Sequence, residues 1–400
     1  MNGQHATAIE YIRLIAGELA GIKRAKHYAL WRDGASARLT DQLGRVPPFS
    51  SHRDLWIHTG DGRHVRATAR TGEWVIDRLV EKMAPDEIFA TFDAQVATNS
   101  ASYVDASPVF GIEIDAICDL GSGITIVPTL SDDPLEALRL LSQFQSVHLP
   151  TGTAILRQTF IVTPAFHVRS TDDRECPGKS DTAPPSPERD NVRARARLAC
   201  LLASNGPVEL PLTVLEPHRD ALFVARERNS AGRPFAAHPK FSRPVAAQDV
   251  KRIYGALAAF DELDSLARSI DRLGRARLAS SPVDRALELG IASEIALMHG
   301  HGEGNAEITH KIGTRAAWLL GRNPSERETI FAETKRLYTA RSQAVHTGVL
   351  SPKSKVDLDA ADELVRRVLR AILEHGRFPI WANLTLGGDG SPTPMKAAKS

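Results

Sequence analysis

An arginine and a histidine, Arg341 and His346, stand five positions apart near the end of a strongly helical stretch of this 400-residue chain. Arginine is always charged, and its planar guanidinium binds two phosphate oxygens at once. Histidine titrates near neutral pH, so it can take or give a proton. The two types together suit metal-independent RNA cleavage, in which the ribose 2′-hydroxyl attacks the adjacent phosphate. DNA lacks that hydroxyl and would be refused.

The spacing of Arg341 and His346 constrains how such a site is built. Five residues turn a regular helix so that the two side chains point about 140° apart. Either the helix is distorted near its end, or a second copy of the chain completes the site in an isologous dimer. A structural interpretation also stands, because an arginine and a histidine in the last turns interact well with the carbonyl end of a helix.

Two further side chains share the face of His346. Ser342 lies four residues before it, and Tyr338 lies one turn earlier. No Gly-x-Ser-x-Gly turn surrounds Ser342, so we expect a supporting or RNA-contacting hydroxyl rather than a hydrolase nucleophile. Tyr338 is expected to pack in the bundle or to stack on a base.

Arg315 lies within an apolar helical stretch. We expect it to form a buried ion pair, with Glu288 or Glu294 as partner. The alternative is that Arg315 lines the groove in which RNA would bind. Residues 299–303 carry two histidines and a glutamate in a predicted turn. They lack a third firm ligand at a spacing that suits a metal ion, so we interpret them as a loop and predict no metal site.

Two segments of the chain resemble a known family. Residues 314–321 (TRAAWLLG) and 338–346 (YTARSQAVH) are similar to the C-terminal half of a HEPN domain of the ApeA-like branch. The superfamily is marked by an arginine, four to six residues, and a histidine. The resemblance covers roughly residues 282–376.

The resemblance implies that Arg341 and His346 are catalytic residues of an endoribonuclease that needs no cofactor. It also implies RNA as substrate, pairing of two motif helices across a homodimer, and a role in bacterial defence or as a toxin. One position departs from the branch, since Thr347 stands between the histidine and Gly348. A non-catalytic HEPN module that binds RNA or nucleotide, or that acts as a dimerisation scaffold, is the alternative. A weaker alternative places the activity in the N-terminal half.

Hydrophobic periodicity predicts an α+β N-terminal domain followed by an all-α, HEPN-like helical bundle. Two hairpins are expected in the first half, over 55–68 and 110–127. The expected bundle helices are 248–278, 283–298, 306–320, 325–346 and 356–374. The expected domains are a sensing or regulatory domain 1–168, a disordered linker 169–191, a mixed connecting segment 192–247, the bundle 248–380 and a flexible tail 381–400.

Composition narrows the class of protein. Fifty basic against 48 acidic side chains give a formal charge of +2. This balance does not indicate an overall basic surface for nucleic acid, so any RNA contact would come from a local basic patch. Three scattered cysteines form no disulfide framework or zinc spacing. With no apolar run of membrane length and no secretory signal, we expect a cytoplasmic protein without membrane contact. The N-terminal domain is expected to recognise an unknown trigger ligand.

Overall fold

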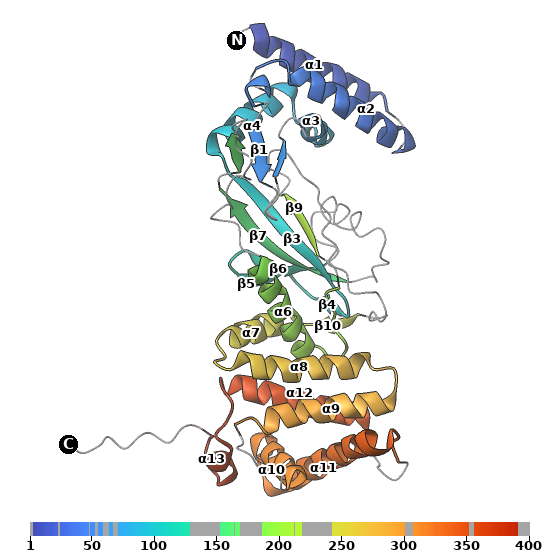
Figure 1. The fold of residues 1–400 in the computed structure, drawn as a ribbon, viewed down its shortest axis with the longest axis vertical. Helices are drawn as coiled ribbons and strands as arrows, with labels where there is room; N and C mark the ends of the chain where they lie inside the picture. The colour runs from blue at the N-terminus through green and yellow to red at the C-terminus, as the bar shows by residue number, and fades with distance from the viewer. Residues whose placement is uncertain are drawn as a thin grey trace, which may run out of the picture. The chain divides into compact units, whose positions relative to one another are not determined.

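The computed structural model describes residues 3–22, 25–47, 49–52, 55–58, 64–66, 71–128, 153–163, 165–168, 186–211, 213–217, 242–300, 307–351 and 356–390. The chain forms two compact units (Figure 1). The N-terminal unit comprises residues 1–107, 157–190 and 212–231, and the C-terminal unit comprises 108–156, 191–211 and 232–400. An α+β part is thus followed by a helical part, as the sequence predicts.

Helices supply most of the core of the N-terminal unit. They are α1 (Gly3–Ala20), α2 (Ala25–Leu43), the 3₁₀ turn η1 (Phe49–His52), α3 (Thr71–Val80) and α4 (Pro85–Thr98). Apolar side chains from four of these elements are buried together, among them Ile12, Leu39, Trp74 and Phe92. Pro85 begins α4 at its first helical position, where a missing N–H costs nothing.

Among the described residues, three sheets accompany the helices. The first has the order β2–β1–β8, the second the order β5–β6–β7–β3–β9, and β4 pairs with β10 in parallel. The predicted hairpins are confirmed where β1 pairs with β2 and β5 with β6, both antiparallel. Strands β3 and β7 each run from one unit into the other. The strands are β1 (Leu55–His58), β2 (His64–Arg66), β3 (Ala101–Val109), β4 (Ile112–Ile114), β5 (Cys118–Gly121), β6 (Ile124–Val127), β7 (Ala154–Val162), β8 (Phe166–Val168), β9 (Val214–Pro217) and β10 (Arg243–Val245).

Helix α9 is the centre of the helical bundle in the C-terminal unit. It packs against α8, α11 and α12, and α10 lies along α11 (Figure 1). The amphipathic α12 turns Leu364, Val368 and Ile372 inward at helical spacing. The helices are α6 (Ser186–Ala203), α7 (Ala247–Ala258), α8 (Leu263–Leu278), α9 (Pro282–Leu297), α10 (Ile308–Leu320), α11 (Pro324–Thr347), α12 (Leu358–Glu374) and α13 (Trp381–Thr385).

A buried arginine ties three of these helices together. Arg277 of α8 forms an ion pair of 2.8 Å with Asp362 of α12, and the two side chains are 2% and 8% exposed. The same guanidinium donates to the backbone carbonyls of Leu201, Ser204 and Gly206 at the end of α6. Because its donors are used so fully, the arginine can stay charged in the interior.

The helix predicted over 248–278 is two helices. The chain leaves α7 after Ala258 and re-enters a helix at Leu263. Between them Phe260 is buried and packs edge-on against Phe378, with ring centroids 5.5 Å apart. Phe260 therefore stays in the core although the helix is interrupted at this point.

The structure also divides the chain differently from the predicted domains. Residues 108–156, expected within the N-terminal domain, group with the helical bundle. Two hydrogen bonds show why: the N–H of Ala247 donates to Asp115 at 2.8 Å, and the thiol of Cys118 donates to the carbonyl of Ala247 at 3.2 Å.

The predicted linker is described only at its end. Residues 169–185 lie outside the described residues, and α6 begins at Ser186, within the predicted linker. Of the predicted tail, residues 381–390 are described and include α13. Among the helices described, none is both long and apolar enough to cross a membrane.

Candidate active site

Helix α11 carries both Arg341 and His346. Its start is capped by Asn323, whose side-chain oxygen accepts from the N–H of Glu326 at 2.9 Å. Its end is closed by Gly348 in the left-handed conformation with φ 68°, and the N–H of Gly348 donates to the carbonyl of Ala344. The helix runs unbroken past both residues, so a distortion does not bring them together. Within one chain the two side chains diverge by about 140°.

Gly290 of α9 places Arg341. A Cβ built at Gly290 would overlap the Cβ and Cγ atoms of Arg341. The arginine stem therefore crosses α9 at the one point where no side chain stands. Since Cβ of Arg341 is fixed to the backbone of α11, this contact sets how closely the two helices approach.

The guanidinium of Arg341 is held by an acid of α9. Arg341 forms an ion pair of 3.0 Å with Glu294, one turn after Gly290, and the two side chains are 24% and 32% exposed. The guanidinium carbon also lies 5.4 Å from the ring centroid of Tyr338. Burial, together with the carboxylate and hydrogen bond of Glu294, raises the pKa of Tyr338.

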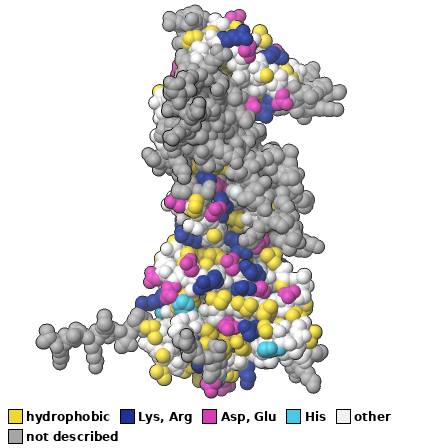
Figure 2. Space-filling view, in the orientation of Figure 1, with side chains coloured by type: hydrophobic (Ala, Val, Ile, Leu, Met, Phe, Trp, Pro, Cys, Tyr) yellow, Lys and Arg dark blue, Asp and Glu magenta, His cyan; other side chains and the backbone are white. Residues whose placement is uncertain are grey.

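An open hollow of about 350 Å³ adjoins this cluster. It lies between α8, α9 and the side of α11, and is lined by Ser265, Arg268, Ile291, Glu294, Ile295, Met298, His299 and Arg341. Figure 2 shows apolar side chains gathered across the helical bundle, with Lys and Arg side chains among them. The lining of the hollow combines apolar side chains with Arg268, Arg341 and the acid Glu294, so it offers both apolar contacts and charged groups to a ligand.

His346 and Ser342 lie outside this lining. His346 is exposed in the last turn of α11, and Ser342 is half-buried. No hydrogen bond joins these two side chains in the described part of the chain. Of the predicted site residues, the structure thus brings together Arg341 and Tyr338.

Arg315 makes contacts other than the expected ones. It donates to the carbonyl of Leu297 and lies 5.3 Å from the ring centroid of Trp381, and burial lowers its pKa. The two acids expected as its partners pair with other arginines, since Glu288 binds Arg272 and Glu294 binds Arg341. Arg315 therefore joins α10 to the end of α9 and to α13.

Gly290 and Glu294 are the site residues that the motif did not reveal. They stand four residues apart on α9, which places them on one face, and that spacing was visible in the sequence. The sequence does not show which residues of α9 face which residues of α11. Across the described residues, no group of three or more His, Cys, Asp or Glu is arranged to hold a metal ion.

The geometry is thus a half-exposed arginine, an acid that holds it, and an exposed histidine turned away on the same helix. Comparison with known proteins adds no assignment to it: no family model, no curated protein and no solved structure matches the chain.

Proposed function

We propose that the chain is a metal-independent endoribonuclease of the HEPN type, working as a homodimer in a bacterial defence or toxin setting. One observation carries the proposal. The regular helix α11 holds Arg341 at the hollow and leaves His346 exposed about 140° away. A two-fold axis beside α11 would bring the histidine of one copy to the arginine of the other. The defence setting rests on the resemblance alone.

In this proposal each side chain has one task. His346 takes the proton from the ribose 2′-hydroxyl and returns one to the leaving 5′-oxygen. Arg341 binds the scissile phosphate and stabilises the added charge of the transition state. Tyr338, beside the guanidinium, stacks on a base, and Ser342 contacts RNA.

The Arg341–Glu294 ion pair favours a second candidate, a non-catalytic HEPN module that binds RNA or nucleotide or joins two chains. While Arg341 is paired with Glu294, it links two helices and stabilises the fold. It can bind RNA only when a phosphate displaces that carboxylate. The two candidates differ in whether His346 is needed for bond cleavage.

The deciding experiment is cleavage of total RNA by the purified full-length chain in excess EDTA. Wild type is compared with His346→Ala, and His310→Ala serves as the matched control because His310 is an exposed histidine on α10. The nuclease proposal expects wild type and His310→Ala to leave 2′,3′-cyclic phosphate ends, and His346→Ala to leave none.

Other outcomes decide against cleavage at this site. Equal cleavage by all three proteins assigns the activity to a contaminant or to another site. RNA binding without cleavage, lost in Arg341→Ala and kept in His346→Ala, supports the binding module.

A further inference from the structure

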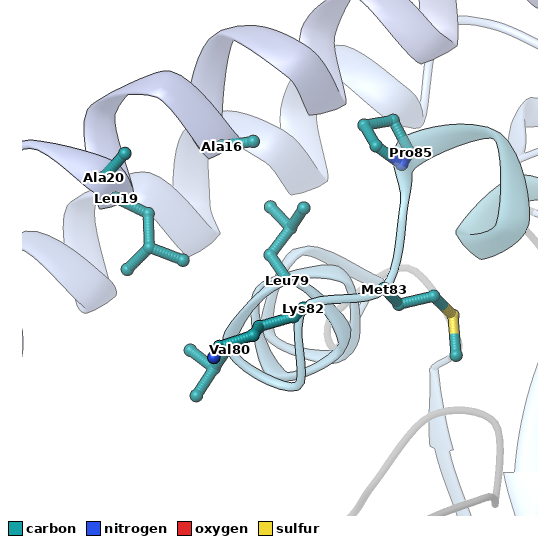
Figure 3. A pocket seen from close by; sticks show the side chains of 8 residues that line it. All are labelled: Ala16, Leu19, Ala20, Leu79, Val80, Lys82, Met83 and Pro85. Atoms are coloured by element: carbon teal, nitrogen blue, oxygen red, sulfur yellow. The ribbon is translucent and has the colours of Figure 1, made fainter.

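The N-terminal unit has an apolar groove that the proposed function does not use. It lies between α1 and the end of α3, has a volume of about 520 Å³, and is lined by Ala16, Leu19, Ala20, Leu79, Val80, Lys82, Met83 and Pro85. Figure 3 shows Leu19 and Leu79 pointing into the space between the two helices. A volume of this size falls within the range of small-molecule sites, which is about 300–1,000 Å³.

The groove keeps a large apolar side chain at the surface. Val80, the last residue of α3, is 48% exposed. On α1, Ala16, Leu19 and Ala20 share one face at helical spacing. Seven of the eight lining residues therefore offer only apolar side-chain atoms, and a polar ligand would gain little there.

Among the described residues that line the groove, Lys82 is the single charged side chain. The acids nearest to the groove in sequence are already paired: Glu81 with Arg78, Asp86 with Arg13, and Glu18 with Arg38. No ion pair joins Lys82 itself to a carboxylate in the described part of the chain. An apolar groove with one uncompensated cation complements an apolar molecule with one negative charge.

The backbone at Lys82 favours glycine rather than lysine. Lys82 has φ 64°, the left-handed conformation that closes α3. Its N–H donates to the carbonyl of Leu79, and that of Met83 donates to Arg78, both at 3.0 Å. Glycine adopts this conformation without strain. A long cationic side chain thus stands at the groove in a position where the fold itself gains nothing from it.

We propose that this groove binds a small amphipathic anion, a single apolar chain that ends in a carboxylate or a similar headgroup. The chain lies between α1 and α3 against Leu19, Leu79 and Val80. The ammonium of Lys82 binds the headgroup at the edge of the groove.

The test is calorimetric titration of the full-length protein with decanoate below its micelle concentration. We expect one saturable site per chain, binding about fivefold weaker with octanoate because two methylenes are removed from a groove open on one side. Decanol, which keeps the chain without the charge, is expected to bind roughly five- to tenfold more weakly than decanoate. Lys82→Met should weaken decanoate by the same factor, whereas Lys251→Met, a matched change at an exposed lysine of the C-terminal unit, should not.

Three results would overturn the proposal. One is the absence of saturable decanoate binding in a wild-type protein whose circular dichroism is that of a folded chain. Another is a binding affinity that does not depend on the charge pair, seen as equal affinity for decanoate and decanol or for wild type and Lys82→Met. The third is a wild-type dimer that Val80→Gln converts to a monomer, since a second copy of the chain would then cover the groove.

Discussion

Replacing Gly290 by alanine tests how α9 positions Arg341. The new Cβ would overlap the Cβ and Cγ of Arg341, which are too close to the α11 backbone to move alone. The two helices must therefore separate, and overpacking of this kind costs about 1–3 kcal/mol of folding free energy. Alanine also gains about 0.5–1 kcal/mol over glycine within a helix, which offsets part of that cost.

Gly255 of α7 is the matched control, because a Cβ there meets no atom within 4 Å. Gly255→Ala is expected to stabilise the chain by the helix-propensity gain alone. The difference between the two variants isolates the contact with Arg341, and we expect it to be about 1–3 kcal/mol. Hydrogen exchange of peptides from α9 and α11 measures it in the C-terminal unit alone, so unfolding of the other unit does not enter.

The reasoning would be refuted if both alanine variants raised protection equally. In that case α9 and α11 do not meet at Gly290. A second check is the double variant Gly290→Ala, Arg341→Ala, which removes the overlapping Cγ and should recover part of the loss. Purely additive effects would mean that the two residues are not in contact.

Three other substitutions have expected outcomes. Arg277→Met leaves the buried Asp362 with only its longer contact of 3.9 Å to Arg285 and should destabilise the bundle by up to about 3–5 kcal/mol, seen as a lower urea midpoint. Burial raises the pKa of Cys118 from 9.0 to about 11, so this thiol should resist thiol reagents at pH 8. The stability that its neutral form contributes is complete below pH 9 and is lost as pH rises through 11. Cys118→Ala should therefore reduce the loss of folding stability between pH 9 and 11. Gly348→Ala forces a side chain into the left-handed region at φ 68° and should lower the helix protection of α11 by about 1 kcal/mol, without changing the charge near His346.

Local rules predicted some elements of the fold and missed others. The expected helix 325–346 closely matches α11, whose ends lie at the capping residues Asn323 and Gly348, because helix caps are local interactions. Helix α4 is not among the expected elements, although Pro85 stands at its first helical position, where proline is common. Helix α2 was missed because its buried stripe is narrow, with Ala35, Leu39 and Leu43 facing the core.

The division into units depends on contacts between residues far apart in the sequence. Residues 108–156 lie with the helical bundle through hydrogen bonds such as that of Ala247 with Asp115, 132 positions away. Composition and periodicity report on neighbours along the chain, so they do not reveal such pairings. For the same reason the sequence named Glu294 as a partner of Arg315, whereas the register of α9 and α11 pairs it with Arg341.

The arrangement around Arg341 links the two candidate functions of the bundle. Within one chain Glu294 pairs with the guanidinium of Arg341, and His346 is exposed on another side of α11. In the proposed nuclease, an RNA phosphodiester, which carries one negative charge as the carboxylate does, competes with Glu294 for Arg341, and a second copy of the chain supplies the histidine. Under the proposed function, loss of Glu294 should therefore strengthen RNA binding without creating cleavage in a monomer. Dimer formation, rather than the affinity for RNA, would then decide between the binding module and the nuclease.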